Sequence, residues 1–172
     1  MQLIVTAVGP DRPGLVGDLT SKLYEAGANI VDSRMANLQG QFALILLLDA
    51  PPDTAATLSG MLPALGQALG LSVVVSPQAR PAKKVAGVPY RLKTYSLDQP
   101  GILARISAVL RERGVNIEDL AARQESAAFA GSELFTIEMT ITVLPARSMR
   151  ERRADLEKVC AALNCDVDLE PA

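Results

Sequence analysis

Apolar residues in the first half of the chain fall into short runs and into stretches with helical spacing. Residues 3–8 form an apolar run rich in β-branched side chains, which predicts a strand that ends at Gly9-Pro10. From Pro13 to Gly27 apolar residues recur at intervals of three or four, which predicts a helix with one apolar face. The apolar positions of this helix are Leu15, Val16, Leu19, Leu23 and Ala26.

The rest of this half predicts two strands, a second helix and a last strand. The segments are strands at 28–38 and 42–48 with a turn between them, a helix from Pro51 to about residue 69, and a strand at 71–75. The resulting order βαββαβ is a split βαβ unit. It predicts an antiparallel four-stranded sheet with both helices on one face.

The second half of the chain repeats the first at an offset of 87 positions. The segment 11–16 reads DRPGLV and recurs at 98–103 as DQPGIL. Between positions 11 and 32, nine of 22 residues are identical without a gap. Two copies of about 85 residues therefore account for the whole chain.

The second copy predicts the same order of elements. Strands are expected at 90–97, 115–124, 134–144 and 166–169, with helices from Ile102 to Gly114 and from Pro145 to about residue 163. The central hairpin is longer here, because Glu125 to Glu133 form a nine-residue loop. Such a loop is either functional or a simple hairpin tip.

We therefore expect an α+β chain of two ferredoxin-like domains. Their predicted bounds are residues 1–77 and 89–172, with a linker at 78–88 that contains proline, alanine and basic residues without periodicity. Because each sheet carries helices on one face only, the other face is expected to be covered by pairing of the two copies or of two chains. A homodimer is the expected assembly.

Composition excludes several classes of chemistry. The 172 residues include no histidine, which excludes Ser-His-Asp and Cys-His sites and histidine metal ligands. No phosphate loop, dinucleotide fingerprint or metal cluster is recognisable. Cys160 and Cys165 form no CxxC pair and are expected to be reduced thiols. We expect no enzymatic activity, no metal and no cofactor.

Net charge and hydropathy argue against nucleic acid and membranes as direct partners. The 17 basic and 19 acidic residues give a net charge of −2, without the basic footprint of direct nucleic-acid binding. The longest strictly apolar run, residues 42–48, is far shorter than the roughly 18 residues of a membrane span. No positive charge precedes the N-terminal apolar stretch, as a signal peptide would require. We expect a cytoplasmic protein without membrane association.

The repeated strand–loop–helix segment has the chemistry to bind a small zwitterion. A helix start offers unpaired N–H groups and a partial positive charge, so the backbone at Gly14 and Leu15 is suited to a carboxylate. Asp11 offers an acceptor for an ammonium group. Asn29 follows the C-terminus of the same helix, so it is expected to reach a ligand only across an interface. The second copy places Asp98, Gly101, Ile102 and Asn116 at the equivalent positions.

A purely structural interpretation of the same residues stays open. Asp11 and Asp98 are acceptable helix caps, and Pro13 and Pro100 suit a first helical turn. The two asparagines could simply relieve the backbone after the glycine that ends each helix.

The two motifs together resemble the ACT domain. Asp-x-Pro-Gly followed by Gly-x-Asn-Ile, inside βαββαβ, occurs in both copies, so the resemblance covers nearly the whole chain. It implies that the chain senses an amino acid, bound at an interface between domains. In the family, the ligand contacts would fall on Asp11, Gly14 and Asn29, and on their counterparts Asp98, Gly101 and Asn116.

A pair of ACT domains without a further domain most resembles the family of glycine cleavage system transcriptional repressors. That resemblance implies negative regulation of glycine catabolism through a partner transcription factor, with glycine as the candidate signal. Two alternatives remain open. One is a regulatory subunit of a biosynthetic enzyme, such as that of acetolactate synthase, and the other is an assembly module that binds no ligand.

Overall fold

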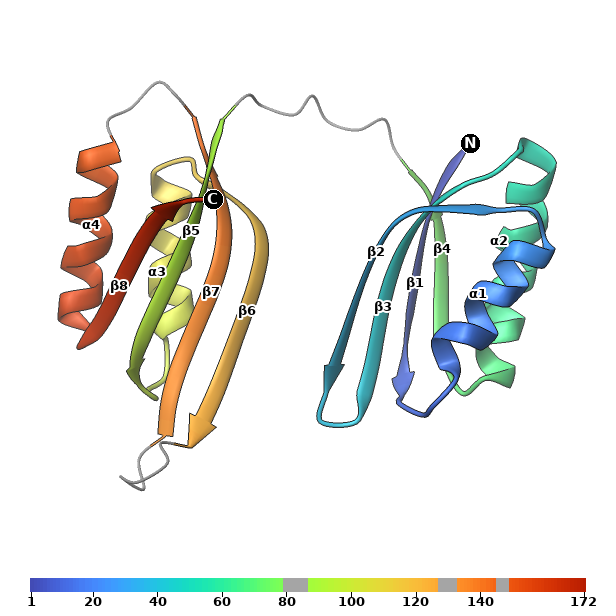
Figure 1. Cartoon of the computed structure of the whole chain (residues 1–172), viewed down its shortest axis with the longest axis horizontal. Helices are drawn as coiled ribbons and strands as arrows, with labels where there is room; N and C mark the ends of the chain where they lie inside the picture. The colour runs from blue at the N-terminus through green and yellow to red at the C-terminus, as the bar shows by residue number, and fades with distance from the viewer. Residues whose placement is uncertain (79–86, 127–132, 145–148) are drawn as a thin grey trace. The chain divides into compact units, whose positions relative to one another are not determined.

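A computed structural model describes residues 1–78, 87–126, 133–144 and 149–172, without the side chains of Ser126 and residues 149–152. The chain divides into two compact units, Met1–Ala82 and Lys83–Ala172, each of which is described by itself (Figure 1). We call them unit 1 and unit 2. The division falls inside the predicted linker, of which residues 79–86 lie outside the described part of the chain.

Unit 1 contains one antiparallel sheet with two helices on one of its faces (Figure 1). Its strand order is β2-β3-β1-β4. The elements are β1 (Gln2–Pro10), α1 (Leu15–Glu25), β2 (Asn29–Leu38), β3 (Gln41–Asp49), α2 (Pro52–Ala68) and β4 (Ser72–Pro77).

Unit 2 has the same topology, with strand order β6-β7-β5-β8. Its elements are β5 (Val88–Leu97), α3 (Ile102–Glu112), β6 (Asn116–Ser126), β7 (Glu133–Val143), α4 (Met149–Ala162) and β8 (Cys165–Pro171). The predicted pair of ferredoxin-like βαββαβ domains is confirmed.

Two details differ from the sequence-based expectation. The first helix begins at Leu15 and not at Pro13, whereas α3 begins at Ile102 as predicted, so Pro13 and Pro100 both lie before their helices. The predicted loop at 125–133 is shorter, because Ser126 still pairs with Glu133. Residues 127–132 and the predicted helix start at Pro145 lie outside the described residues.

Each unit has its own apolar core between sheet and helices. In unit 1 alternate residues of β1 and β3 meet one row of α1, as in Leu3, Leu46 and Leu19. Val16, which the sequence placed on the apolar face, is 41% exposed, because it lies one position off the row formed by Leu15 and Leu19. The buried row therefore has three leucines, Leu15, Leu19 and Leu23.

The core of unit 2 contains polar groups where unit 1 has none. Thr94 and Ser96 of β5 are buried, and their hydroxyl oxygens have no hydrogen-bond partner among the described residues. At the offset of 87, the same positions in β1 are Ala7 and Gly9. A buried hydroxyl without a partner lowers stability, since its hydration is lost and not replaced.

The two cysteines of unit 2 are free thiols in its core. Cys160 is the last buried residue of α4, and Cys165 is the first residue of β8. Burial and the neighbouring Cys165 raise the pKa of the Cys160 thiol to about 12. The thiol is therefore protonated, and poorly nucleophilic, at neutral pH.

We predict that Thr94→Val stabilises unit 2. The change keeps the shape of the side chain and removes the unpaired hydroxyl, so the free energy of unfolding should rise by about 1 kcal/mol in urea denaturation. Thr140→Val, on the face of the sheet away from the helices, is the control and should stay within about 0.5 kcal/mol of the parent. A loss of stability in Thr94→Val would show that the hydroxyl is hydrogen-bonded.

Candidate functional site

Each copy joins its first strand to its first helix through a glycine in a left-handed conformation. Gly14 has φ +92° and Gly101 has φ +94°. A side chain is strained in this conformation, which explains glycine at both positions. The buried Leu15 and Ile102 follow at once and anchor the helix start in the core. We call residues 10–15 and 97–102 junction 1 and junction 2.

The helix starts at both junctions are not covered by a capping side chain. Gly14 and Gly101 are the N-cap residues, and neither helix has a side-chain cap hydrogen bond. The carbonyl of Gly14 accepts the first helical bond from the Asp18 amide at 2.8 Å. The first-turn N–H groups therefore remain available to a ligand and carry the positive end of the helix dipole.

The alternative interpretation, in which the two aspartates cap the helices, is wrong, because Gly14 and Gly101 are the N-cap residues. Asp11 Oδ2 accepts a hydrogen bond from Asn37 Nδ2 at 2.5 Å, and Asp98 Oδ2 accepts one from Gln124 Nε2 at 3.0 Å. The donors lie near the end of β2 and β6, so the carboxylates are held by the sheet and not by the helix. Each carboxylate is exposed and keeps acceptor capacity for a further donor.

This carboxylate–amide pair was not predicted from the sequence. Asn37 and Gln124 are 26 residues beyond their partners, and they are related to each other by the offset of 87. The sequence signal that could have indicated this pair is the side-chain amide that both copies carry at this position. The main chain repeats too, since the Asp11 amide donates to the Gly40 carbonyl at 2.8 Å and the Asp98 amide to the Glu133 carbonyl at 2.9 Å.

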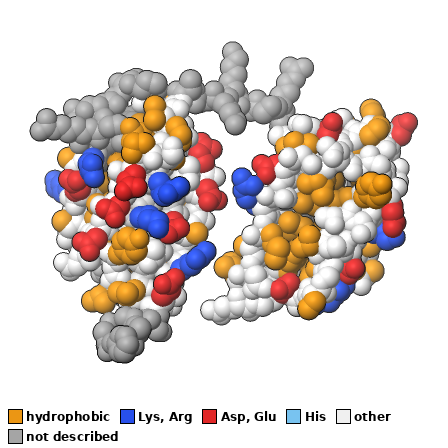
Figure 2. Space-filling view, viewed as in Figure 1, with side chains coloured by type: hydrophobic (Ala, Val, Ile, Leu, Met, Phe, Trp, Pro, Cys, Tyr) orange, Lys and Arg blue, Asp and Glu red, His pale blue; other side chains and the backbone are white. Residues whose placement is uncertain are grey.

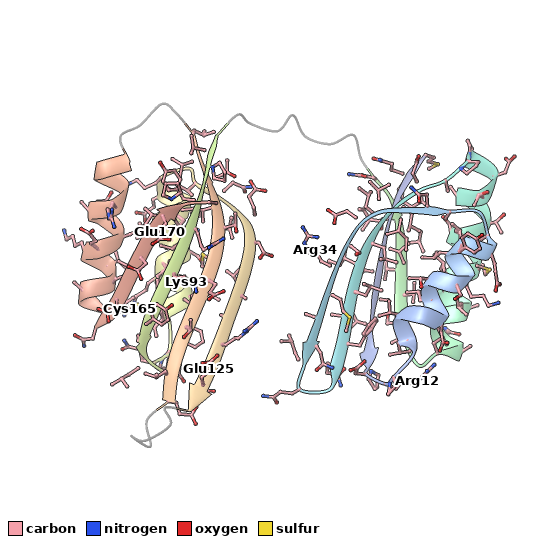
Figure 3. The ribbon with its side chains drawn as sticks, viewed as in Figure 1. Arg12, Arg34, Lys93, Glu125, Cys165 and Glu170 are labelled. Carbon is pink, nitrogen blue, oxygen red and sulfur yellow. The ribbon has the colours of Figure 1, made fainter. Side chains whose placement is uncertain are left out.

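The residue after the aspartate distinguishes the two junctions. Arg12, at the lower end of unit 1 in Figure 3, donates to Asp18 Oδ2 at 3.0 Å and to the Pro13 carbonyl at 3.2 Å. A cation therefore lies beside the start of α1. Its counterpart Gln99 is neutral and donates to the Leu163 carbonyl, just beyond α4, at 2.5 Å.

Asn29 and Asn116 lie at the other end of their sheets. Asn29 is in register with Asp49 and Gln2, whereas Asp11 follows Pro10 at the far end of β1. Eight residue steps of a strand separate the two ends by about 26 Å. A single unit thus does not bring Asn29 to its own junction, and the same register separates Asn116 from Asp98.

The two asparagines line matching surface hollows. Asn29 borders a hollow together with Tyr24 at the end of α1, and Asn116 borders one together with Arg111 at the end of α3. Asn116 also donates to Glu118 Oε1 at 2.6 Å. The predicted binding residues therefore form two separate groups in each unit, one at the junction and one at the hollow.

No group of three or more Cys, Asp and Glu residues in the described part of the chain is placed to hold a metal ion. No helix in that part of the chain is both long and apolar enough to cross a membrane.

Both halves of the chain match a known protein family. A model of the ACT domain matches residues 1–76, and a second ACT-domain model matches residues 90–157. The chain belongs to the ACT-domain family. It carries two ACT domains in tandem, and one family match falls within each of the two βαββαβ units.

Relatives of the whole tandem chain are also known. The glycine cleavage system transcriptional repressor of Escherichia coli K12 is 28% identical over 163 residues, covering 94% of this chain and 85% of the repressor. The crystal structure of an unknown protein from Galdieria sulphuraria is 28% identical, with a TM-score of 0.81 over 99% of this chain and 98% of that one.

A solved structure provisionally assigned as such a repressor supports the fold. It is 24% identical, with a TM-score of 0.73 over 98% of this chain and 95% of that one. The chain is thus a regulatory ACT-domain protein related to the glycine cleavage system transcriptional repressor.

We predict opposite effects of alanine at two neighbouring glycines. Gly14→Ala forces a side chain into the left-handed region at φ +92° and should lower the stability of unit 1 by about 1 kcal/mol. Gly17→Ala, inside α1 with open space around it, should raise stability by about 0.5–1 kcal/mol. Urea denaturation measures both, and equal effects would contradict the conformation of junction 1.

Proposed function

We propose that this chain is a non-catalytic, cytoplasmic regulator that binds a small amino acid at its junctions and transmits the binding to a protein partner. Glycine is the first candidate ligand, and a transcription factor is the candidate partner. The relationship to a transcriptional repressor of the glycine cleavage system supports glycine as ligand and a role in transcription. The absence of histidine from the sequence supports a non-catalytic role.

The observation that carries this proposal is the duplicated, uncapped junction. An α-amino acid has a carboxylate and an ammonium group on one carbon atom. The helix start with Gly14 offers N–H donors to the carboxylate, and the Asp11 carboxylate beside it offers an acceptor to the ammonium group. Junction 2 repeats both features with Gly101 and Asp98. At junction 1 the guanidinium of Arg12, paired with Asp18, also lies beside the helix start.

The second group of predicted residues completes the proposed site. Asn29 and Asn116 lie too far from their own junctions to contact the same small molecule. We therefore place them opposite a junction of another domain, as contributors to a ligand site that forms at a domain interface. In this arrangement, binding of the amino acid and association of domains stabilise each other.

The size of the ligand limits the affinity. Small ligands reach at best about 1.5 kcal/mol per non-hydrogen atom, so glycine, with its five such atoms, binds with at most about 7.5 kcal/mol. This corresponds to a dissociation constant of a few micromolar or weaker. Such affinities suit a metabolite sensor, and regulation requires that the ligand binds one state of the protein more tightly than the other.

Isothermal titration calorimetry with a panel of amino acids, starting with glycine, tests the proposal. We expect saturable binding to the full chain by at least one amino acid. Asp11→Ala and Asp98→Ala should each weaken binding at one junction at least about tenfold, because a charge-assisted hydrogen bond is lost. The double variant should bind at least about tenfold more weakly than the parent at both junctions.

Asp53→Ala is the matched control, because it also removes one exposed carboxylate from the start of a helix, α2. It should bind like the parent. Absence of binding by every amino acid would refute the sensing function, and equal binding in the double variant would place the ligand elsewhere. Circular dichroism should confirm that all variants are folded.

A further inference from the structure

The sheet of unit 1 has one face that no described element of the unit covers. Neighbouring residues of a strand point to opposite sides, so this face is made of alternate residues of each strand. We call it open face 1, with Ile4, Thr6, Val8, Ile45, Leu47 and Val74 as its central members. Val8 is 43%, Ile45 50% and Val74 58% exposed. A contiguous apolar area of this kind marks an interaction surface.

The equivalent face of unit 2 is charged. The row Thr6, Ile45 and Val74, which crosses the middle of open face 1, corresponds by register to Lys93, Glu138 and Asp168 in unit 2. Figure 2 shows basic and acidic side chains interspersed over the visible side of unit 2, where β5, β6 and β7 lie in front of α3. The two copies therefore share a backbone fold but differ in the side chains on this face of the sheet.

The charges of unit 2 are matched within the unit. Lys93, labelled in Figure 3, lies 2.6 Å from Glu138. This hydrogen bond raises the pKa of Lys93 and lowers the pKa of Glu138, so both groups stay charged. Burial of such a surface against apolar groups would remove its hydration without replacing it. This face suits solvent, and it makes a poor cover for open face 1.

The few charges of open face 1 cancel. At its β2 edge Arg34 lies 2.9 Å from Asp32, and at one end the Met1 amine lies 3.3 Å from Asp49. Arg34 points away from the helices of its unit (Figure 3). A surface that is apolar at its centre and neutral at its edge is compatible with a copy of itself, since no like charges are forced together.

The area of the face is sufficient for a weak, specific dimer. Four strands spaced by about 4.8 Å and about 26 Å long present roughly 500 Å². Two such faces bury about 1,000 Å² in total, at the lower limit for specific interfaces. Sheets that pack face to face in this way lie about 10 Å apart and interdigitate their side chains.

We propose that open face 1 binds the same face of a second copy of this chain, around a two-fold axis. The dimer then has a sandwich of two unit 1 sheets at its centre. The polar face of unit 2 remains in water. The proposal does not depend on amino-acid binding, and its test uses no ligand.

Sedimentation equilibrium of the full chain between about 1 and 200 µM tests this proposal. The parent should show a monomer–dimer equilibrium. Ile45→Glu and Val74→Glu each place a charge at the centre of the interface, and each should weaken dimerisation at least tenfold. Because both residues are half exposed within unit 1, both variants should keep the parental circular dichroism spectrum. The milder Val74→Thr should weaken dimerisation less, and it serves if a glutamate variant fails to fold.

Thr140→Glu is the matched control. Thr140 lies opposite Arg91 in unit 2, as Leu47 lies opposite Ile4 in unit 1, and the substitution adds the same single charge. It should dimerise like the parent. The proposal is overturned if the parent is monomeric throughout, if folded Ile45→Glu and Val74→Glu dimerise like the parent, or if Thr140→Glu weakens the dimer equally. The last result would place the open face of unit 2 in the contact.

Discussion

The helix start after each first strand depends on a glycine that holds φ near +90°. This backbone conformation turns the chain from the sheet into α1 or α3 and leaves no side chain over the first N–H groups of the helix. The buried residue that follows, Leu15 or Ile102, fixes the turn from the core side. The adjacent aspartate is held by an amide near the end of the second strand. A donor site and an acceptor site thus come together at the same edge of each sheet, which is the basis of the proposed function.

Duplication preserved this backbone while the side chains of the two copies diverged. Junction 1 has Arg12 beside the helix start. Junction 2 has Gln99 instead, which donates a hydrogen bond to the Leu163 carbonyl just beyond α4. The sheets differ in the same way, since the apolar Ile45 of unit 1 corresponds to the charged Glu138 of unit 2. We infer a division of roles, in which unit 1 provides the dimer contact and unit 2 keeps a hydrated sheet surface.

The sequence was sufficient for the fold but only partly for the site. Apolar periodicity and the offset of 87 predict all twelve elements, because helices and strands bury their faces with different periods. Periodicity and the repeat do not show which residue is the N-cap of the first helix. The segment Asp-x-Pro-Gly is compatible with an aspartate cap and equally with a left-handed glycine at the N-cap. The Asp11–Asn37 bond escaped prediction because its partners are 26 residues apart and meet only through the pairing of β1, β3 and β2. The contrast between the open faces likewise requires the strand register.

An NMR titration of the ¹⁵N-labelled chain tests amino-acid binding at the junctions most directly. Glycine and then other amino acids are added up to about 10 mM, where even a millimolar site is filled. We expect saturable shifts of the backbone amide signals of Gly14 and Leu15, and of Gly101 and Ile102, for at least one amino acid. If no amino acid shifts the signals of either junction, or if the shifts cluster elsewhere in the chain, the junctions are not the ligand site.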